Sequence, residues 1–241
     1  MNIRALVIHL ERARDRRAQV DRILAEAPVP GEVLDAMDAR TIPAEHLGGY
    51  TRQLHKPRYP FECSKAEIAC FLSHRKAWQA IVDKGLDAGL IIEDDVEFAP
   101  GFKEIYEHAL SVVQPGDFVR FAKDNRERVR RPLLQDTACH VFVPKTVGLG
   151  MLAQLVTREA ARKLLAATEV FDRPVDTLLQ MTWITGVRML TVHPSPVRDV
   201  SETLGGTTVQ HGRGKPAKLR REIVRPLYRI AINRRSRRER P

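Results

Sequence analysis

Short, wholly apolar runs alternate along this chain with longer segments in which apolar residues recur every three or four positions. Residues 5–9 (ALVIH) have the pattern of a buried strand, and the apolar residues between 20 and 27 then follow at helical spacing, in a helix that begins near Asp15. Parallel strands need a crossover between them, usually a helix, so this alternation predicts an α/β layered domain with a mostly parallel sheet. The 241 residues are enough for one such domain with an appendage.

The other elements follow from the same two periodicities and from breaks at Gly and Pro. Residues 64–67 (SKAE) form a capping box, S-x-x-E, which predicts a helix that opens at Ser64. Residues 40–62 lack periodicity and indicate a long loop, and residues 123–131 are a polar, arginine-rich stretch. We expect further strands at 31–35 (leading into the polar turn 35–40), 90–96, 117–122, 140–143, 149–156 and, as the last, 187–194, and further helices at 102–113, 158–168 and 174–183.

The formal net charge of +10 is concentrated in residues 211–241, which hold twelve Lys and Arg against two acidic residues. The rest of the chain is neutral, which argues against a general nucleic-acid-binding domain. We therefore expect a domain at 1–205 and a basic amphipathic tail at 206–241.

Apolar residues in this tail fall at helical spacing, and Pro226 would kink that helix or mark its start. The tail is expected to be either a solvated basic terminus or an amphipathic helix on an anionic membrane surface, and no aromatic-rich module accompanies it for RNA binding. The apolar residues are Leu219, Ile223, Val224, Leu227, Tyr228 and Ala231.

The three cysteines (Cys63, Cys70 and Cys139) are odd in number and lack the C-x2-C spacing of a zinc site. We expect reduced thiols in a cytosolic protein. The N-terminal apolar run is too short for a secretory signal, and no later run approaches about 18 apolar residues, so we expect neither a signal peptide nor a membrane-spanning helix.

Three adjacent carboxylates, Glu93, Asp94 and Asp95, end the apolar run of residues 90–96 (LIIEDDV). Ligands of such sheets bind beyond the carboxyl ends of the strands, so the triplet is expected to face that crevice. Three interpretations of the triplet are possible. The first is purely structural, because successive strand side chains point to opposite faces and the three carboxylates need not meet. The second is an acid pair of Walker-B or phosphoacceptor type with Mg²⁺, and the third is a metal site for a nucleotide diphosphate, with Glu93 and Asp95 on one side.

The Walker-B and phosphoacceptor interpretations both lack a required feature. A phosphoacceptor would normally have its acidic pair at the end of the first strand, where this chain has VIHL (residues 7–10). A phosphate loop, G-x-x-x-x-G-K-[ST], is absent, and the nearest match has Pro216 after Lys215. Residues 148–153 (GLGMLA) match the dinucleotide fingerprint G-x-G-x-x-A, with Asp172 about 20 residues on, which keeps an NAD-dependent oxidoreductase using Gly148–Ala153 as an alternative. However, this segment itself has the pattern of a strand rather than of a strand-to-helix turn.

Several segments, taken in order, resemble glycosyltransferase family 25, which contains bacterial lipooligosaccharide galactosyltransferases and collagen-modifying enzymes. The resemblance covers about residues 1–200, and its most specific parts are EIACFLSH, EDDV and PVD. The segments are VIHLERARDRR, DAMDAR, SKAEIACFLSHRKAW, LIIEDDV, GLGMLAQLVTREAARKLL and RPVDTLLQ.

The resemblance implies a GT-A-type, Rossmann-like fold that binds a nucleotide sugar. It implies a UDP-sugar donor, UDP-galactose or a close relative, and transfer of the hexose with inversion at the anomeric carbon. The acceptor would be a lipid-linked oligosaccharide of lipooligosaccharide, lipopolysaccharide or another surface glycan. The protein would be cytoplasmic and attached peripherally to the inner face of the cytoplasmic membrane through residues 211–241.

The resemblance also supplies the positive charge that the acidic triplet needs, namely a divalent cation, Mn²⁺ or Mg²⁺, and the donor that it carries. Glu93-x-Asp95 then stands where the family has its D-x-D-type motif, and hard cations prefer such carboxylate oxygens. We expect Asp95 and Glu93 to hold the metal, with Asp95 as the direct ligand. Glu93 or Asp94 would face the nucleotide.

Five further residues are expected at the donor. Arg12, Arg16 and Arg17 follow the first strand, where guanidinium groups can pair with a diphosphate, although a solvated helix face is the alternative for at least one of them. Asp38 belongs to the DAMDAR turn, and Ser73 to the family's SH pair.

Three residues are expected to be catalytic. Glu67 and His74 lie seven positions apart on one helix face, although Glu67 also fits a pure capping role and His74 a satisfied, half-buried ring. Inverting transfer needs a base at the acceptor hydroxyl, and we expect Asp176 in RPVD to be that base. The alternative role for Asp176 is helix capping. His193 is expected to be an exposed histidine, with metal ligation as the alternative.

The chain departs from the family pattern at two places. GMLAQL stands where the family usually has an aromatic residue, and VRFAK lacks an acidic residue that often follows the equivalent strand. A non-catalytic, membrane-attached nucleotide-sugar-binding protein is therefore the competing class.

Overall fold

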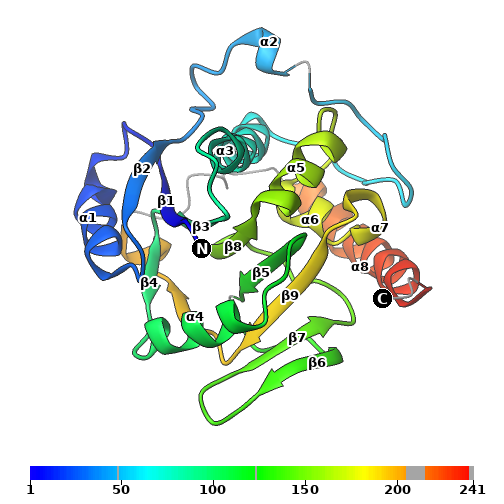
Figure 1. Cartoon of the computed structure of the whole chain (residues 1–241). Coiled ribbons are helices and arrows are strands. Elements are labelled where there is room, and N and C mark those ends of the chain that lie inside the picture. The colour runs from blue at the N-terminus through cyan, green and yellow to red at the C-terminus, as the bar shows by residue number, and fades with distance from the viewer. Residues whose placement is uncertain (48, 123, 205–214, 239–241) are drawn as a thin grey trace.

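The computed structural model describes residues 1–47, 49–122, 124–204 and 215–238. Its centre is an eight-stranded sheet in which six strands point one way and β8 and β7 run against them (Figure 1). The expected α/β architecture with a mostly parallel sheet is confirmed. The strands, in sheet order, are β2 (Gly31–Asp35), β1 (Ile3–His9), β3 (Ala88–Glu93), β8 (Ala153–Thr157), β5 (Asp117–Phe121), β9 (Arg188–His193), β7 (His140–Pro144) and β6 (Val129–Gln135).

Helices cover both faces of the sheet, because its central strands are apolar on both sides. In β1, Ala5 and Val7 face one core and Leu6 and Ile8 face the other, as the period of two requires. The first core includes side chains of α1 (Arg17–Glu26) and α4 (Phe102–Ser111), and the second those of α3 (Lys65–Asp83), α5 (Arg158–Ala167) and α6 (Val175–Leu179) (Figure 1).

Local signals in the sequence set several of these boundaries. Ser64 caps α3, with the amide of Glu67 donating to its hydroxyl at 3.2 Å and its own amide donating to the Glu67 carboxylate at 2.7 Å. The hydroxyl of Thr157 caps α5 by accepting from the amide of Ala160 at 3.3 Å. The expected loop at 40–62 holds one short helix, α2 (Ala44–Leu47), and the expected helix near Asp15 is preceded by the short η1 (Arg14–Arg16).

Four expected boundaries are wrong. The expected polar stretch 123–131 contains the start of β6, an edge strand whose mostly solvated faces and Pro132 give no alternating pattern. The strand expected at 149–156 begins only at Ala153, and the helix expected at 174–183 is divided into α6 and α7 (Thr182–Thr185). Residues 187–194 are not the last strand, because β10 (Val197–Asp199) follows and pairs with β4 (Val96–Phe98), before η2 (Ser201–Leu204).

The tail contains a long helix, α8 (Lys215–Arg238), with Pro226 inside it. One face of α8 lies against the domain: Tyr228 accepts a hydrogen bond from Arg173 at 2.7 Å, and Ile232 and Ser236 are buried. Leu227 and Ile230 are exposed, so the apolar residues of this helix are divided between the domain and solvent. Residues 206–214 and the side chains of Leu219 and Ile223 lie outside the described part.

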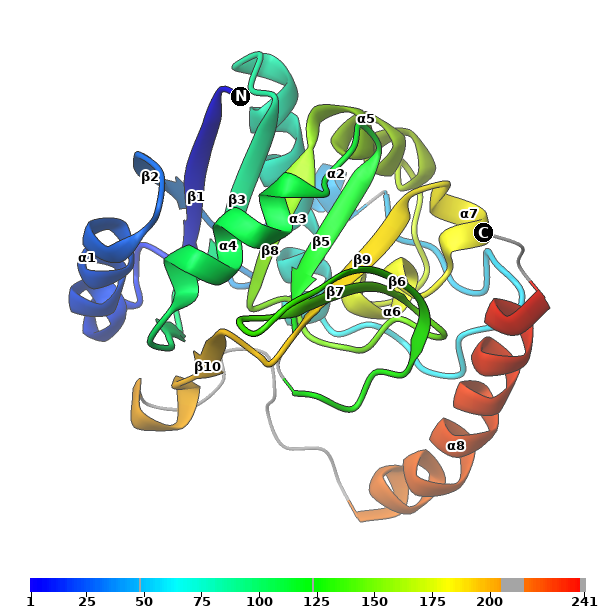
Figure 2. The same cartoon turned by 60° about the horizontal axis from the view of Figure 1, so that its bottom comes forward.

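Figure 1 shows α8 beside α6 and α7, and in Figure 2 the C-terminal end of α8 lies near α7. The Arg235 guanidinium lies 5.7 Å from the centre of the Trp183 ring of α7, in agreement with that placement. Within the described residues, no helix combines the length and the apolar character needed to cross a bilayer. All three cysteines are free thiols, as expected.

Candidate functional site

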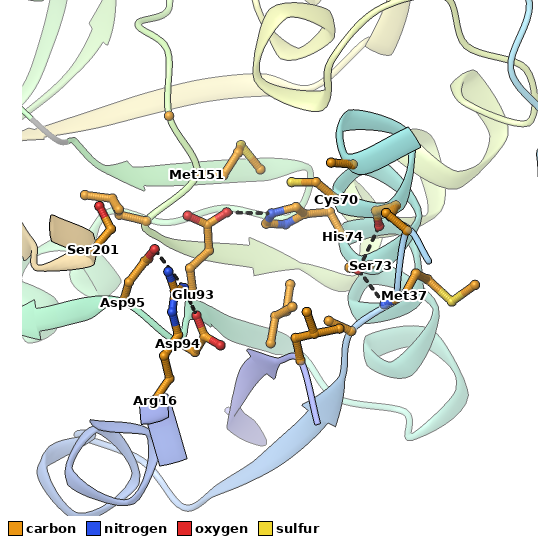
Figure 3. Close-up of a pocket in the computed structure, with 18 of the residues that line it drawn as sticks. Arg16, Met37, Cys70, Ser73, His74, Glu93, Asp94, Asp95, Met151 and Ser201 are labelled. Carbon is orange, nitrogen blue, oxygen red and sulfur yellow. Dashed lines mark hydrogen bonds and ion pairs between the residues drawn. The ribbon is translucent and has the colours of Figure 1, made fainter. Parts of the chain in front are cut away.

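A cavity of about 310 Å³ lies beyond the carboxyl ends of β1, β2 and β3. We call it the acidic cavity, because Glu93, Asp94 and Asp95 line it together (Figure 3). Arg16 enters from η1, and Cys70, Ser73 and His74 come from α3. Ligands of α/β sheets usually bind beyond the carboxyl ends of the strands, which is where the acidic cavity lies, so the acidic triplet faces the expected crevice.

Part of the positive charge that the triplet needs comes from Arg16. This buried guanidinium donates to Asp94 at 2.5 Å and to Asp95 at 3.1 Å (Figure 3). Burial disfavours its charged form, but the two carboxylates outweigh that effect and raise the pKa of Arg16. Asp94 also contacts the ring of His9 at 2.9 Å, so its two oxygens are both engaged within the protein.

Glu93 and Asp95 are less well compensated than Asp94. Burial and then the neighbouring Asp95 and Asp94 raise the pKa of Glu93 well above its usual range. Its nearest partner is His74 Nε2 at 3.3 Å, and burial lowers the pKa of that imidazole to about 3, so the ring is neutral and brings no charge (Figure 3). Burial likewise raises the pKa of Asp95, whose Oδ1 is buried and without a hydrogen-bond partner.

These features fit a divalent cation. A buried carboxylate oxygen without a partner, beside a second carboxylate whose ionisation is disfavoured, is the arrangement that a bound cation reverses. Glu93 and Asp95 offer the hard oxygen donors that Mg²⁺ and Mn²⁺ prefer, and His74 offers a neutral nitrogen. Donor atoms of Cys70, His74 and Glu93 also lie within 4.8 Å of one another, although burial raises the pKa of the Cys70 thiol well above its usual range and disfavours a thiolate ligand.

Two of the expected donor residues, Asp38 and Ser73, shape the rim of the acidic cavity. Arg12 lines the cavity and donates to Asp38 at 2.6 Å, and Asp38 also accepts from the amide of Arg40. Ser73 accepts from the amide of Met37 at 2.8 Å, which ties the turn after β2 to α3 (Figure 3). The DAMDAR turn is therefore held from both sides.

Three expected or considered residues lie elsewhere. Arg17 is exposed and pairs with Asp21 at 3.0 Å, which is the solvated-helix arrangement. Glu67 closes the capping box and does not line the acidic cavity. His193 is half-buried against Phe142, with ring centres 4.8 Å apart, rather than exposed.

Asp176 stands between the acidic cavity and a second cavity of about 870 Å³. Its Oδ2 accepts from the amide of Gly150 at 3.1 Å, and Gly150 lines both cavities while Asp176 lines the larger one. The charge of Asp176 contributes to the raised pKa of Glu93. Its carboxylate accepts from another loop and from the adjacent Thr177 hydroxyl. It also stands in the first turn of α6, where an acid is favoured by the helix dipole, so the rival role at the helix start fits the structure as well.

Gly148 and Gly150 do not form a dinucleotide-binding turn. They lie in the loop before β8, and the fingerprint requires a turn that follows a strand and opens a helix. Asp172, the acid expected about 20 residues on, is fully buried against Arg173. The oxidoreductase alternative is therefore wrong on geometry.

The sequence interpretation missed Cys70 and Asp199, which line the acidic cavity, and His9, which contacts the cavity residue Asp94. His9 ends β1 and holds Asp94, Cys70 lies one turn before His74, and Asp199 of β10 lines the wall and adds to the raised pKa of both Glu93 and Asp95. The position of His9 at a strand end was a usable signal. Asp199 carried none, because β10 was not expected.

The sequence profile described as glycosyltransferase family 25 (LPS biosynthesis protein) matches residues 2–179. The chain belongs to glycosyltransferase family 25. The match contains the acidic triplet, the SH pair on α3 and Asp176, and it ends before β9, β10 and α8.

Curated relatives in the family include proteins named as active and as inactive. Procollagen galactosyltransferase 1 of Danio rerio is 31% identical over 191 residues, which cover 73% of this chain and 31% of the relative. The Bos taurus protein named probable inactive glycosyltransferase 25 family member 3 is 32% identical, over 72% of this chain and 30% of the relative. The chain thus spans about a third of the length of these relatives.

Two solved structures are distantly similar. A glycosyltransferase involved in the glycosylation of the major capsid of PBCV-1 matches 67% of this chain and 62% of its own, at 10% identity and a TM-score of 0.35. Mannose-1-phosphate geranyltransferase from Thermus thermophilus matches 86% and 80%, at 11% identity and a TM-score of 0.42. Similarity at this level carries no argument about the site.

Proposed function

We propose that the protein is a GT-A-type glycosyltransferase that moves a hexose from a UDP-sugar to a saccharide acceptor, with inversion and with Mn²⁺ or Mg²⁺. The observation that carries the proposal is the acidic cavity itself: a family 25 chain places two poorly compensated carboxylates, Glu93 and Asp95, beside Arg16 at the carboxyl ends of its strands. Galactose is the proposed sugar because the similar Danio rerio protein is named a galactosyltransferase.

The donor end of the reaction would use the cation and two arginines. Glu93 and Asp95 would hold the cation, which offsets the charge that develops on the diphosphate as UDP leaves. Arg16 is fixed by Asp94 and Asp95, and Arg12, whose side chain is 38% exposed, has room to reach a phosphate oxygen. The chain thereby arranges positive charge around a leaving group that bears negative charge.

The acceptor end would use Asp176 as the base. The acceptor hydroxyl attacks the anomeric carbon from the side opposite the diphosphate, and its proton passes to the Asp176 carboxylate as the new C–O bond forms. The bond from the anomeric carbon to the diphosphate oxygen breaks, and its electron pair leaves on UDP. The position of Asp176 between the two cavities supports this role, whereas Glu67 is removed from the acidic cavity.

We also propose that the acceptor is a lipid-linked oligosaccharide and that the protein is cytoplasmic and attached to the inner face of the cytoplasmic membrane through residues 211–241. The description of the family as LPS biosynthesis proteins supports the acceptor class. The exposed Leu227 and Ile230, among arginines of α8, support contact with an anionic surface. This contact would use the outward face of α8 alone.

One observation favours a second candidate, a protein that binds nucleotide sugars without transferring them. Relatives named inactive are as similar to this chain as relatives named galactosyltransferases. The two candidates differ only in turnover, because both predict donor binding in the acidic cavity.

The test is UDP release from a panel of UDP-sugars, with and without Mn²⁺ and with lipooligosaccharide acceptors, for wild type and Asp95→Asn. Release that needs the metal, favours one sugar, rises with an acceptor and is lost in the variant is the expected result. UDP binding by calorimetry without any release would favour the non-catalytic candidate, and the absence of both would refute the proposed function.

A further inference from the structure

The larger cavity differs from the acidic cavity in charge. It is bounded by the segments that follow β5 and β7, by α6, and by the face of α8 that carries Arg229, Ile232 and Arg237. We call it the basic cleft, after the four cations on its walls that are discussed below. Figure 2 shows α8 running past the region where β6, β7 and α6 lie.

The acidic residues of the basic cleft already have partners. Glu127 is almost fully buried, pairs with Arg120 and accepts from the amide of Gly148 at 2.8 Å. Asp124 pairs with Arg126 at 3.4 Å. Asp176, as described above, accepts from a backbone amide and is expected to meet the acceptor hydroxyl.

Four cations of the basic cleft have no such partner. Arg128 and Lys145 stand on one wall, and Arg229 and Arg237 on the α8 wall. Among the residues that the structure describes, no carboxylate lies within 4.0 Å of any of these four charged groups. Like charges that converge on a concave surface concentrate a positive potential there, and such a surface selects an anionic ligand.

The α8 wall is held in place by buried contacts. Arg173 is fully buried and donates to Tyr228, and the Tyr228 ring packs edge-on against Tyr59 with centres 5.4 Å apart. Ile232, one turn further along, is buried between Arg229 and Arg237 in the sequence. The two arginines are therefore presented on a fixed helix face.

We propose that the basic cleft binds the acceptor and that this acceptor is an anionic saccharide, one that carries a phosphate or carboxylate group. The proposal rests on the proposed transferase function and names its acceptor class. The acceptor hydroxyl meets Asp176 at the junction with the acidic cavity, and the anionic group pairs with the cations of the α8 wall and the facing wall. The tail charge of this helix thus serves recognition inside the protein and is only in part available to a membrane.

The test measures binding directly, without turnover. Saturation-transfer NMR would compare a neutral oligosaccharide with its phosphorylated and its uronate-bearing counterparts, for the wild-type chain of residues 1–241 and two cleft variants. The variants are Arg229→Ala/Arg237→Ala and Arg128→Ala/Lys145→Ala. We expect wild type to bind one or both anionic saccharides at least tenfold more tightly than the neutral one, and each variant to lose most of that preference.

A matched control removes the same charge from the same helix. Arg234 and Arg238 are exposed on α8 and do not line the basic cleft, so Arg234→Ala/Arg238→Ala should change saccharide binding by less than twofold. Equal loss in this control, or equal wild-type binding of neutral and anionic saccharides, would overturn the inference.

Two further measurements distinguish an acceptor site in the basic cleft from a donor site and from a lipid site. The Kd for UDP, measured by calorimetry, should change less than twofold in the cleft variants; a large loss would show that the cleft holds the donor instead. Sedimentation with phosphatidylglycerol vesicles should also be the same in the cleft variants and wild type. If the cleft variants lose vesicle binding and keep saccharide binding, the cleft is a lipid site and the inference is wrong. Failure of wild type to bind UDP would refute the proposed function and would leave the test of the basic cleft unaffected.

Discussion

Arg173 is the residue whose loss should disturb this protein most outside the acidic cavity. Its guanidinium is fully buried, donates to Asp172 at 2.6 and 2.9 Å, and reaches the hydroxyl of Tyr228 at 2.7 Å. It also donates to the carbonyl groups of His55 and Pro57, both at 3.2 Å. This one side chain therefore joins α8 and the long loop before α3 to the segment that leads into α6.

The substitution Arg173→Met removes this charge and leaves Asp172 buried, with the amide of His55 still donating to it at 3.0 Å. Breaking a buried ion pair by removing one partner costs about 3–5 kcal/mol. For a chain of this size that corresponds to a fall in Tm of roughly 6–20 °C. The same substitution at Arg17, whose pair with Asp21 is solvent-exposed, should cost about 0–1 kcal/mol.

The assay is urea unfolding followed by tryptophan fluorescence, with limited trypsin digestion as a second readout. Trp183 packs against Arg235 of α8, so release of that helix should change the native-state fluorescence of Arg173→Met and expose α8 to trypsin. The double variant Asp172→Asn/Arg173→Met should recover roughly 0.5–3 kcal/mol of the loss, because no buried charge remains. Equal destabilisation by Arg173→Met and Arg17→Met would refute the reasoning.

Three further predictions concern the acidic cavity, the base and the membrane. Asp176→Asn should lower kcat by about 10²–10⁴ while the Kd for UDP stays the same, as single-turnover kinetics and calorimetry would show; an unchanged kcat would exclude Asp176 as the base. Burial and neighbouring carboxylates raise the pKa of Glu93, so the folded protein loses stability as the pH rises from the unfolded value of about 4.3 through the higher folded value. In EDTA, Glu93→Gln should therefore be about 0.5–2 kcal/mol more stable than wild type at pH 8 and no more stable at pH 4. Mn²⁺ should raise the Tm of wild type and not that of the variant. Thermal melts at both pH values test this, and a variant less stable than wild type at pH 8 would contradict it. Leu227→Gln/Ile230→Gln should reduce sedimentation with phosphatidylglycerol vesicles and leave the Tm within about 2 °C, since both side chains are exposed; undiminished sedimentation would argue against membrane contact through α8.

The position of the acidic triplet could be predicted from the sequence because it depends on local signals. An apolar run, its end, and the rule that ligands bind at carboxyl ends of strands together located Glu93, Asp94 and Asp95 at the cavity. The capping box at Ser64 fixed the start of α3. It did not fix the contact of His74 with Glu93, which depends on how α3 packs against β3.

The division of roles within the triplet could not be predicted, because it depends on contacts between distant segments. Asp94 is occupied by His9 and Arg16, whereas Asp95 Oδ1 has no partner, and no spacing in LIIEDDV records that difference. The edge strand β6 and the short β10 were missed for a related reason. Their pairing is set by neighbours in the sheet, and their own residues lack the alternation that marks a half-buried strand.

The tail shows why composition alone misleads about the use of charge. Twelve cations in residues 211–241 suggest a single purpose, yet the described part of α8 has two faces. Tyr228, Ile232 and Ser236, four residues apart, lie on one face and fix the helix to the domain, which turns Arg229 and Arg237 toward the basic cleft. The protein then has an acidic cavity that needs a cation and, next to it, a basic cleft that needs an anion, with Asp176 at their junction. This opposition favours two different ligands held side by side, which is what transfer between a donor and an acceptor requires.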